Sequence, residues 1–129
     1  MTEPIIIVDN IHKSYLMGKE AVPALRGVSL NIHPGEFVCL MGPSGSGKST
    51  LLNIIGGLDL PSAGRIEIAG KDLLTLSAHQ RVLYKRETVG FVWQQPSRNL
   101  LPYLTARENI ELPMMLKGGR QRRERALSL

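Results

Sequence analysis

The chain has 129 residues, enough for one domain, and 43% of them are apolar. Aromatic residues make up only 5%, so the core must be built mainly from Leu, Ile and Val. The net charge of +5 is concentrated in residues 117–129, which carry +4 and leave +1 for the rest of the chain. A nucleic-acid surface needs a basic patch on the folded body. We therefore expect no nucleic-acid partner.

The single cysteine, Cys39, lies in the apolar run 37–41, which predicts a buried thiol and excludes a disulfide within the chain. A signal peptide has a basic flank followed by a long apolar segment, and the first residues do not show this pattern. No apolar run approaches the roughly 20 residues that span a bilayer. We expect a cytosolic chain that reaches a membrane only through a partner.

The first half of the chain predicts strands, a glycine-rich loop and a helix. Short β-branched runs predict strands at residues 5–8 and 28–32. Residues 36–41 predict a third strand, which is apolar throughout its second half, as expected for a strand buried on both faces. After the loop, residues 48–55 predict a helix that ends at Gly56-Gly57.

The second half alternates short elements with polar loops. Thr105 and Glu108 form a capping-box pattern, which predicts the start of a helix. The predicted elements are a strand over 65–69, a helix over 77–87, a strand over 89–94, a helix from Thr105 to about residue 116, and a helix over 120–129.

The phosphate loop, residues 42–50, fits the pattern G-x-x-x-x-G-K-[ST] between an apolar run and a predicted helix. Glycines let the backbone curl so that several N–H groups face one anion, and the helix dipole points at the same place. Lys48 adds a charge on the β- and γ-phosphates, and Ser49 can ligate Mg²⁺. The predicted cofactor-binding residues here are Gly42, Pro43, Ser44, Gly45, Ser46, Gly47, Lys48, Ser49 and Thr50.

Around this loop the sequence resembles the ATP-binding-cassette (ABC) ATPases over nearly its whole length. The resembling blocks are Ile11-His12-Lys13-Ser14-Tyr15, Ala24-Leu25-Arg26-Gly27-Val28-Ser29-Leu30, Pro34-Gly35-Glu36, Gly64-Arg65-Ile66, Gly70-Lys71-Asp72 and Val89-Gly90-Phe91-Val92-Trp93-Gln94. The resemblance implies that Tyr15 stacks on adenine, so the nucleotide is ATP with Mg²⁺. It also implies that Gln94 is the catalytic sensor, which approaches Mg²⁺ together with Ser49 and couples the site to the membrane subunit.

Residues 99–110 are similar to one branch of this family, the ATPases of lipoprotein-release, macrolide-export and cell-division type transporters. Residues 95–98 make the preceding segment slightly longer than in that branch. The resemblance implies an ABC permease as partner, contacted through the region after Gln94, and a homodimer or pseudo-dimer of ATP-binding domains. It also implies a peripheral location on the cytoplasmic face of the plasma membrane.

The implied fold is α/β: a P-loop NTPase with a RecA-like core and an antiparallel β edge. The antiparallel region is expected over about 1–35 and 60–72, the P-loop core over about 36–58 and 88–95, and the start of the helical subdomain over about 105–129. We expect the N-terminal part of one ATP-binding domain, lacking most of the helical subdomain and the later core strands. The general base would lie in the missing part, so this chain alone is expected to bind nucleotide without measurable hydrolysis.

Two segments imitate motifs of the missing part. Residues 5–9 look like a strand ending in a Mg²⁺-binding aspartate, but they precede the loop and Asn10 follows instead of a glutamate. Residues 76–80 look like the family signature, but Ala78 and His79 replace glycines that let backbone N–H groups approach a phosphate. We predict a plain first strand and a helix start capped by Ser77.

Two alternative functions remain open. Nucleoside monophosphate kinases carry a similar phosphate loop, but close to their N-terminus, whereas 41 residues including Tyr15 precede it here. They also have no counterpart of Gln94. A short form that binds nucleotide, or occupies a permease, without hydrolysis is the other alternative.

Overall fold

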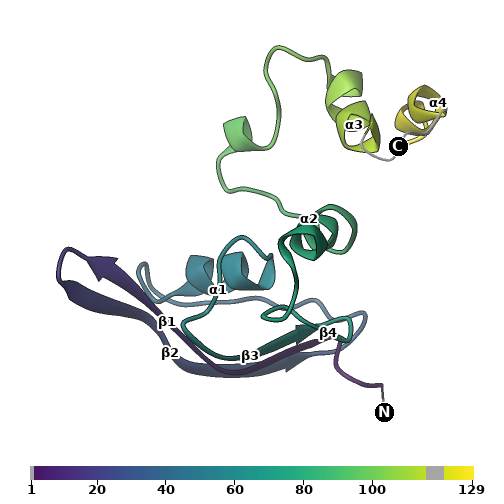
Figure 1. The fold of residues 1–129 in the computed structure, drawn as a ribbon. Coiled ribbons are helices and arrows are strands. Elements are labelled where there is room, and N and C mark those ends of the chain that lie inside the picture. Colours follow the sequence, from purple (N-terminus) through teal and green to yellow (C-terminus); the bar gives the residue numbers. More distant parts are fainter. Residues whose placement is uncertain (1, 116–120) are drawn as a thin grey trace. The chain divides into compact units, whose positions relative to one another are not determined.

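An antiparallel sheet of four strands organises residues 1–90, the first of two structural units (Figure 1). The computed structural model describes residues 2–115 and 121–129. The strands are β1 (Ile6–Met17), β2 (Glu20–Ile32), β3 (Ala63–Ile68) and β4 (Lys71–Asp72), in the spatial order β2-β1-β3-β4. The sheet confirms the antiparallel β edge predicted from the sequence.

The first two strands are longer than predicted. β1 pairs with β2 from Ile6 opposite Ile32 as far as Met17 opposite Glu20, and Gly18 turns the chain with φ +68°. The added residues, 9–17 of β1 and 20–27 of β2, are mostly exposed. They show no regular alternation of apolar and polar residues, so there was no strand signal to read. We call residues 12–25 the hairpin arm.

A bulge at Asn10 divides β1, and the pairing with both neighbouring strands shifts register there. Asn10 has φ +48°, and its backbone N–H donates to Ser29 Oγ (2.9 Å). Gly64 approaches it closely: its φ is +103°, and a Cβ there would lie 2.4 Å from the Asn10 carbonyl oxygen. Residues 6–9 lie at the start of β1, before the bulge, so the prediction of a first strand here is confirmed except at Ile5.

Helix α1 (Lys48–Ile55) covers one face of the sheet and has the predicted bounds (Figure 1). Gly56 ends it, donating its N–H to Leu52 O (2.8 Å). Leu51 and Ile54 face the sheet and are buried, whereas Leu52 is half exposed. The core of this unit consists of Val8, Ile11, Leu25, Leu51, Ile54, Ile66, Ile68, Leu73 and Tyr84.

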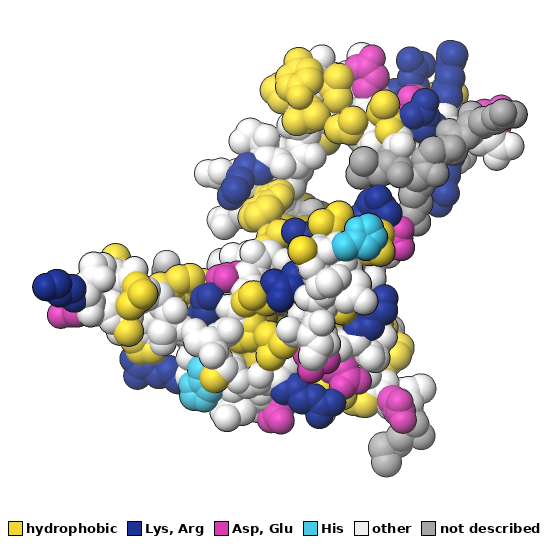
Figure 2. All heavy atoms as spheres, in the orientation of Figure 1, with side chains coloured by type: hydrophobic (Ala, Val, Ile, Leu, Met, Phe, Trp, Pro, Cys, Tyr) yellow, Lys and Arg dark blue, Asp and Glu magenta, His cyan; other side chains and the backbone are white. Residues whose placement is uncertain are grey.

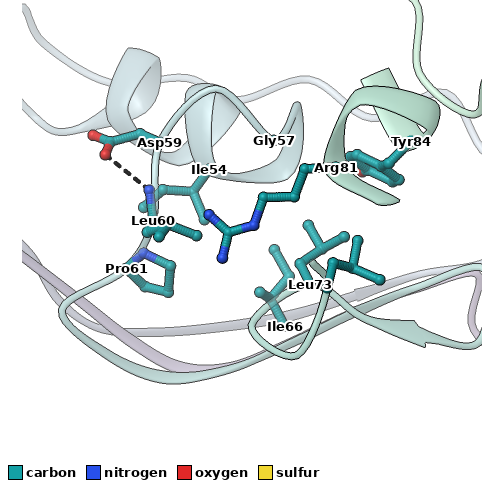
Figure 3. A pocket seen from close by; sticks show the side chains of 10 residues that line it. Ile54, Gly57, Asp59, Leu60, Pro61, Ile66, Leu73, Arg81 and Tyr84 are labelled. Atoms are coloured by element: carbon teal, nitrogen blue, oxygen red, sulfur yellow. Dashed lines mark hydrogen bonds between the residues drawn. The ribbon is translucent and has the colours of Figure 1, made fainter. Parts of the chain in front are cut away.

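Helix α2 (Ala78–Glu87) begins at the predicted cap. Ser77 Oγ accepts the Gln80 N–H (3.2 Å), and Gln80 Oε1 accepts the Ser77 N–H (2.8 Å). Tyr84 ties this helix to α1, because its hydroxyl donates to Ile55 O (2.6 Å). Burial raises the pKa of Tyr84 to about 12, so the phenol remains a donor. Figure 3 shows its ring beside Gly57, where a Cβ would lie 2.9 Å from ring carbons.

Two predicted strands do not form. Residues 36–41 and 89–94 lie outside any helix or strand, and Phe37 and Val92 are 99% and 86% exposed. Cys39, predicted to be buried, is exposed. Strands are stabilised by hydrogen bonds to neighbouring strands, and no described residue provides such a neighbour to either segment. The predictions of these strands and of a buried thiol are therefore wrong for this chain.

The second unit, residues 91–129, contains the short 3₁₀ turn η1 (Pro96–Arg98) and the helices α3 (Ala106–Met115) and α4 (Arg122–Leu127). The capping box of α3 is confirmed: Thr105 N–H donates to Glu108 Oε2 (3.0 Å), and Glu108 N–H donates to Thr105 Oγ1 (3.2 Å). Residue 116, the predicted break at 117–119 and residue 120 lie outside the described residues. Among the described helices, none has the length and apolar content needed to cross a membrane.

We expect Gly64→Ala to lower the free energy of unfolding by about 2–4 kcal/mol, from left-handed strain plus the clash with the bulge. Gly70→Ala is the matched control, because Gly70 also has a positive φ (+74°) but a Cβ there would have no atom within 4 Å. It should cost only about 1–2 kcal/mol. Urea unfolding followed by far-UV circular dichroism measures both values. Equal losses would show that the bulge contact does not stabilise the sheet.

Candidate nucleotide-binding site

The glycine-rich stretch before α1 forms a tight curl. Ser46 N–H donates to Pro43 O (3.2 Å), while Gly45 and Gly47 have φ values of +80° and +94°. A Cβ on Gly42 would lie 2.9 Å from Ser46 Oγ. Residues with side chains adopt such conformations and approaches only with strain. The glycines of the motif are therefore required by the shape of the curl.

Gly47 also fixes this curl to the sheet. A Cβ there would lie 2.6 Å from the Ala24 carbonyl oxygen and 2.8 Å from Leu25 Cδ2, both on β2. Leu25 belongs to the core and is only 5% exposed. The junction between loop and helix thus rests directly on the backbone of β2.

The start of α1 presents backbone donors that the helix does not use. Gly47 is the N-cap and has no side chain to cap the helix, and Leu51 N–H is the donor that reaches back to Gly47 O (2.9 Å). The N–H groups of Lys48, Ser49 and Thr50 have no backbone partner among the described residues. A helix start of this kind favours an anion.

Lys48 brings its charge back over the same curl. Its Nζ donates to the carbonyl oxygens of Gly42 and Pro43, the latter at 2.9 Å, and lies 3.4 Å from Ser46 Oγ. Ser49 is exposed next to it. A cation, unused N–H donors and a hydroxyl are thus gathered within one short stretch of backbone. These groups fit the phosphates and the Mg²⁺ ion of a nucleotide, because phosphates accept hydrogen bonds and Mg²⁺ prefers oxygen ligands.

Tyr15 lies on the hairpin arm, in the same unit as the phosphate loop and on the strand next to β2. Its hydroxyl donates to Asp59 Oδ2 (3.0 Å), and Tyr15 is 39% exposed. Lys13 Nζ donates to Asp59 Oδ1 (3.0 Å) and Leu60 O (2.7 Å), and lies 5.0 Å from the centre of the Tyr15 ring. The structure therefore places an accessible aromatic ring, fixed at its hydroxyl, in the unit that holds the loop.

The Asp59 carboxylate is the centre of this cluster. Burial tends to raise the pKa of Asp59, but hydrogen bonds from Lys13, the Leu60 backbone and Tyr15, with the Lys13 charge, bring the pKa below its ordinary value. Asp59 is therefore ionised at neutral pH and can hold both side chains of the arm at once.

Gln94 lies in the second unit, in an exposed bend before η1. Asn99 holds the backbone on both sides of it: Oδ1 accepts the Trp93 N–H (2.7 Å), and Nδ2 donates to Trp93 O (2.8 Å) and Gln95 O (3.3 Å). The Arg98 guanidinium lies 4.2 Å from the centre of the Trp93 ring. Residues 95–98 therefore form one turn that Asn99 closes.

Sequence reasoning named the loop, Tyr15 and Gln94, but missed two residues that hold them in place. The nine loop residues and Tyr15 lie in one unit, whereas Gln94 lies in the other. Asp59 gave little signal beyond its position in a turn between Gly57 and Pro61. Asn99 had a clearer signal, since asparagine side chains often bond nearby backbone groups in turns.

A small cavity between α1, α2 and the sheet is a different kind of feature (Figure 3). Its volume is about 10 Å³, and Ile54, Leu73 and Tyr84 are among its lining residues. Arg81 points into it, and its buried Nε has no hydrogen-bond partner in the part of the chain that the structure describes. The cavity has room for about one water molecule, so it is not a nucleotide site.

A glycine curl that ends in a lysine and opens a helix over a sheet defines the class of P-loop NTPases. The chain belongs to the ABC transporter family, because the model of that family matches residues 25–129. This confirms the resemblance seen in the sequence and the α/β fold inferred from it. The nucleoside monophosphate kinase alternative is set aside, since that enzyme is a different family.

Relatives with known names agree with the predicted branch. The chain is 50% identical to the macrolide export ATP-binding/permease protein MacB of Marinobacter nauticus, over 89% of this chain and 18% of that protein. It is 49% identical to the lipoprotein-releasing system ATP-binding protein LolD of Ruegeria pomeroyi, over 92% of this chain and 51% of that protein. The chain thus spans about half or less of these relatives.

A solved structure gives the same result for the fold. It is the dimeric post-hydrolysis state of the ATP-binding cassette MJ0796 bound to ADP and Pi, a protein of Methanocaldococcus jannaschii. The TM-score is 0.84 and the identity 48%, over 95% of this chain and 54% of that chain.

We expect Asn99→Ala to loosen the bend that carries Gln94, and Trp93 can report this because it is the only tryptophan. The emission of Trp93 should shift to the red, and iodide should quench it more strongly because the indole is more exposed. The loss of these hydrogen bonds should cost about 1–3 kcal/mol of stability. Asn109→Ala is the matched control: Asn109 makes the same kind of contact with Leu101, Leu104 and Thr105. An equal emission change in both variants would contradict a specific role of Asn99 in holding the bend.

Proposed function

We propose that this chain binds ATP with Mg²⁺ as part of the ATP-binding subunit of an ABC transporter. The observation that carries the proposal is the curl of residues 42–48, which gathers one cation and the unused donors of α1 while resting on β2. In this assignment the N–H groups at the start of α1 and Lys48 Nζ hold the phosphates, and Ser49 Oγ is the first Mg²⁺ ligand. Gly42, Pro43, Ser44, Gly45, Ser46, Gly47 and Thr50 supply the remaining backbone and side-chain contacts of the loop.

Tyr15 and Gln94 are the other two residues of this assignment. The exposed ring of Tyr15 stacks on adenine, which distinguishes ATP from phosphate alone. Gln94 acts as the sensor that approaches Mg²⁺ and the attacking water. Bound ATP would supply the phosphoanhydride bond. The residues of this chain orient the phosphates and neutralise their charge. The general base is not assigned to any described residue.

The whole protein is proposed to hydrolyse ATP and to couple hydrolysis to a membrane permease. The names of MacB and LolD, an export ATP-binding/permease protein and the ATP-binding protein of a releasing system, support this proposal and favour export or extraction. The dimeric MJ0796 cassette supports action as a homodimer or pseudo-dimer. The proposed location is the cytoplasmic face of the plasma membrane, with the region after Gln94 as the contact with the permease. Within this assignment the 129 residues bind nucleotide without turning it over.

Replacement of Lys48 tests the proposal most simply. Lys48→Ala removes the only full charge in the curl, so it should weaken binding of ATP and of inorganic tripolyphosphate alike, about 10–100-fold for each. Displacement of a fluorescent ribose-labelled ATP in the presence of Mg²⁺ measures both affinities. Lys71→Ala on β4 is the control and should change neither. Unchanged ATP affinity in Lys48→Ala would refute the assignment of the loop.

A further inference from the structure

We propose that Asp59 is a positioning residue for the adenine base, acting through Tyr15 and Lys13. The inference rests on the proposed function, because it assumes that Tyr15 receives the base. Asp59 touches neither the loop nor the proposed base position directly in this assignment. Asp59 instead fixes the Tyr15 ring, which would contact the base. It thereby sets how strongly the site prefers ATP over phosphate alone.

The exposed position of Tyr15 makes an anchor necessary. The ring lies near the end of the hairpin arm, where the neighbouring Leu16 and Met17 are 80% and 70% exposed. Figure 2 shows hydrophobic side chains at the surface of this arm, just behind its charged tip. An unanchored aromatic ring at such a place would lose rotamer freedom when a base stacked on it. The bond from Tyr15 to Asp59 Oδ2 (3.0 Å) removes that freedom beforehand.

Lys13 determines which face of the ring is available. Its side chain is only 14% exposed, and its Nζ is held by Asp59 Oδ1 and Leu60 O at 5.0 Å from the ring centre. The ammonium group therefore covers one face of Tyr15 as a cation–π contact. A base can stack on the other face. Asp59 thus fixes the ring at its hydroxyl and orients the cation behind it.

Asp59 is itself positioned by the helix that carries the phosphate loop. Beyond the end of α1 the chain doubles back, and the N–H groups of Leu58 (2.8 Å) and Asp59 (3.3 Å) donate to Asn53 O inside the helix. In Figure 3 this segment leads from Gly57 to Asp59. The Asp59 carboxylate accepts a hydrogen bond from the Leu60 N–H (2.8 Å). α1 therefore begins at the phosphate-binding residues and ends by placing the anchor of Tyr15. The two halves of the proposed nucleotide site share one rigid element.

A comparison of two ligands separates this role from a general structural one. With the full chain and Mg²⁺, displacement of ribose-labelled ATP gives the affinities of ATP and of inorganic tripolyphosphate. Asp59→Ala should weaken ATP binding about fivefold, part of the full stacking contribution, and leave tripolyphosphate within about twofold. Tyr15→Phe, which keeps the ring but loses the bond to Asp59, should show the same selective loss. Asp72→Ala, a carboxylate on β4 that bonds the Leu74 N–H, should change neither affinity.

The double variant completes the test. If Asp59 acts through Tyr15, the loss in Asp59→Ala with Tyr15→Ala should equal that of Tyr15→Ala alone. Additive losses, an equal loss of both ligands in Asp59→Ala, or no loss of ATP affinity would each overturn the inference. Failure of the proposed function looks different: the original chain would bind neither ligand, or Tyr15→Ala would leave the preference for ATP unchanged. Either of those results would overturn the positioning role together with the adenine assignment.

Discussion

The contact between Gly47 and the backbone of β2 is the constraint on which the site depends. Because no Cβ separates them, the start of α1 can rest against the Ala24 carbonyl oxygen. The left-handed conformation of Gly47 turns the chain from the curl into the helix, and the first N–H groups of α1 have no backbone partner among the described residues. A larger residue would move the helix start off the sheet, and the loop would lose the surface that holds its shape.

The same helix connects this constraint to the rest of the first unit. Its buried side chains join the core between the sheet and the helices that cover it, and the Tyr84 hydroxyl of α2 bonds its last turn. Its returning end carries Asp59 to the hairpin arm, where that carboxylate meets Tyr15. The proposed phosphate-binding residues, the core and the proposed base-stacking residue therefore all depend on α1, although they are far apart in sequence. In the second unit, Asn99 has a comparable local role around Gln94.

Sequence reasoning succeeded where the signal is local and failed where it is not. The bounds of α1 follow from glycines at both ends, the start of α2 from the predicted cap Ser77, and the start of α3 from the predicted capping box. The strands predicted over 36–41 and 89–94 depend on neighbouring strands, which no periodicity within a segment can supply. The hairpin arm was missed because its residues show no apolar alternation, and Asp59 was missed because its partners are over 40 residues away. The curl of the loop was predictable, since its motif places glycines where the backbone is left-handed and a lysine at the start of the helix.

A titration of the isotopically labelled chain with inorganic tripolyphosphate, followed by backbone amide resonances, tests the central claim most directly. The account predicts that the largest shifts fall on Gly45, Gly47, Lys48 and Ser49, which belong to the curl or to the first turn of α1. The amides of Gly18 and Gly70, which have left-handed conformations elsewhere in the same unit, should hardly move. Shifts confined to the arginines of α4, or spread evenly over the chain, would show that phosphate is attracted only by surface charge and would contradict the account.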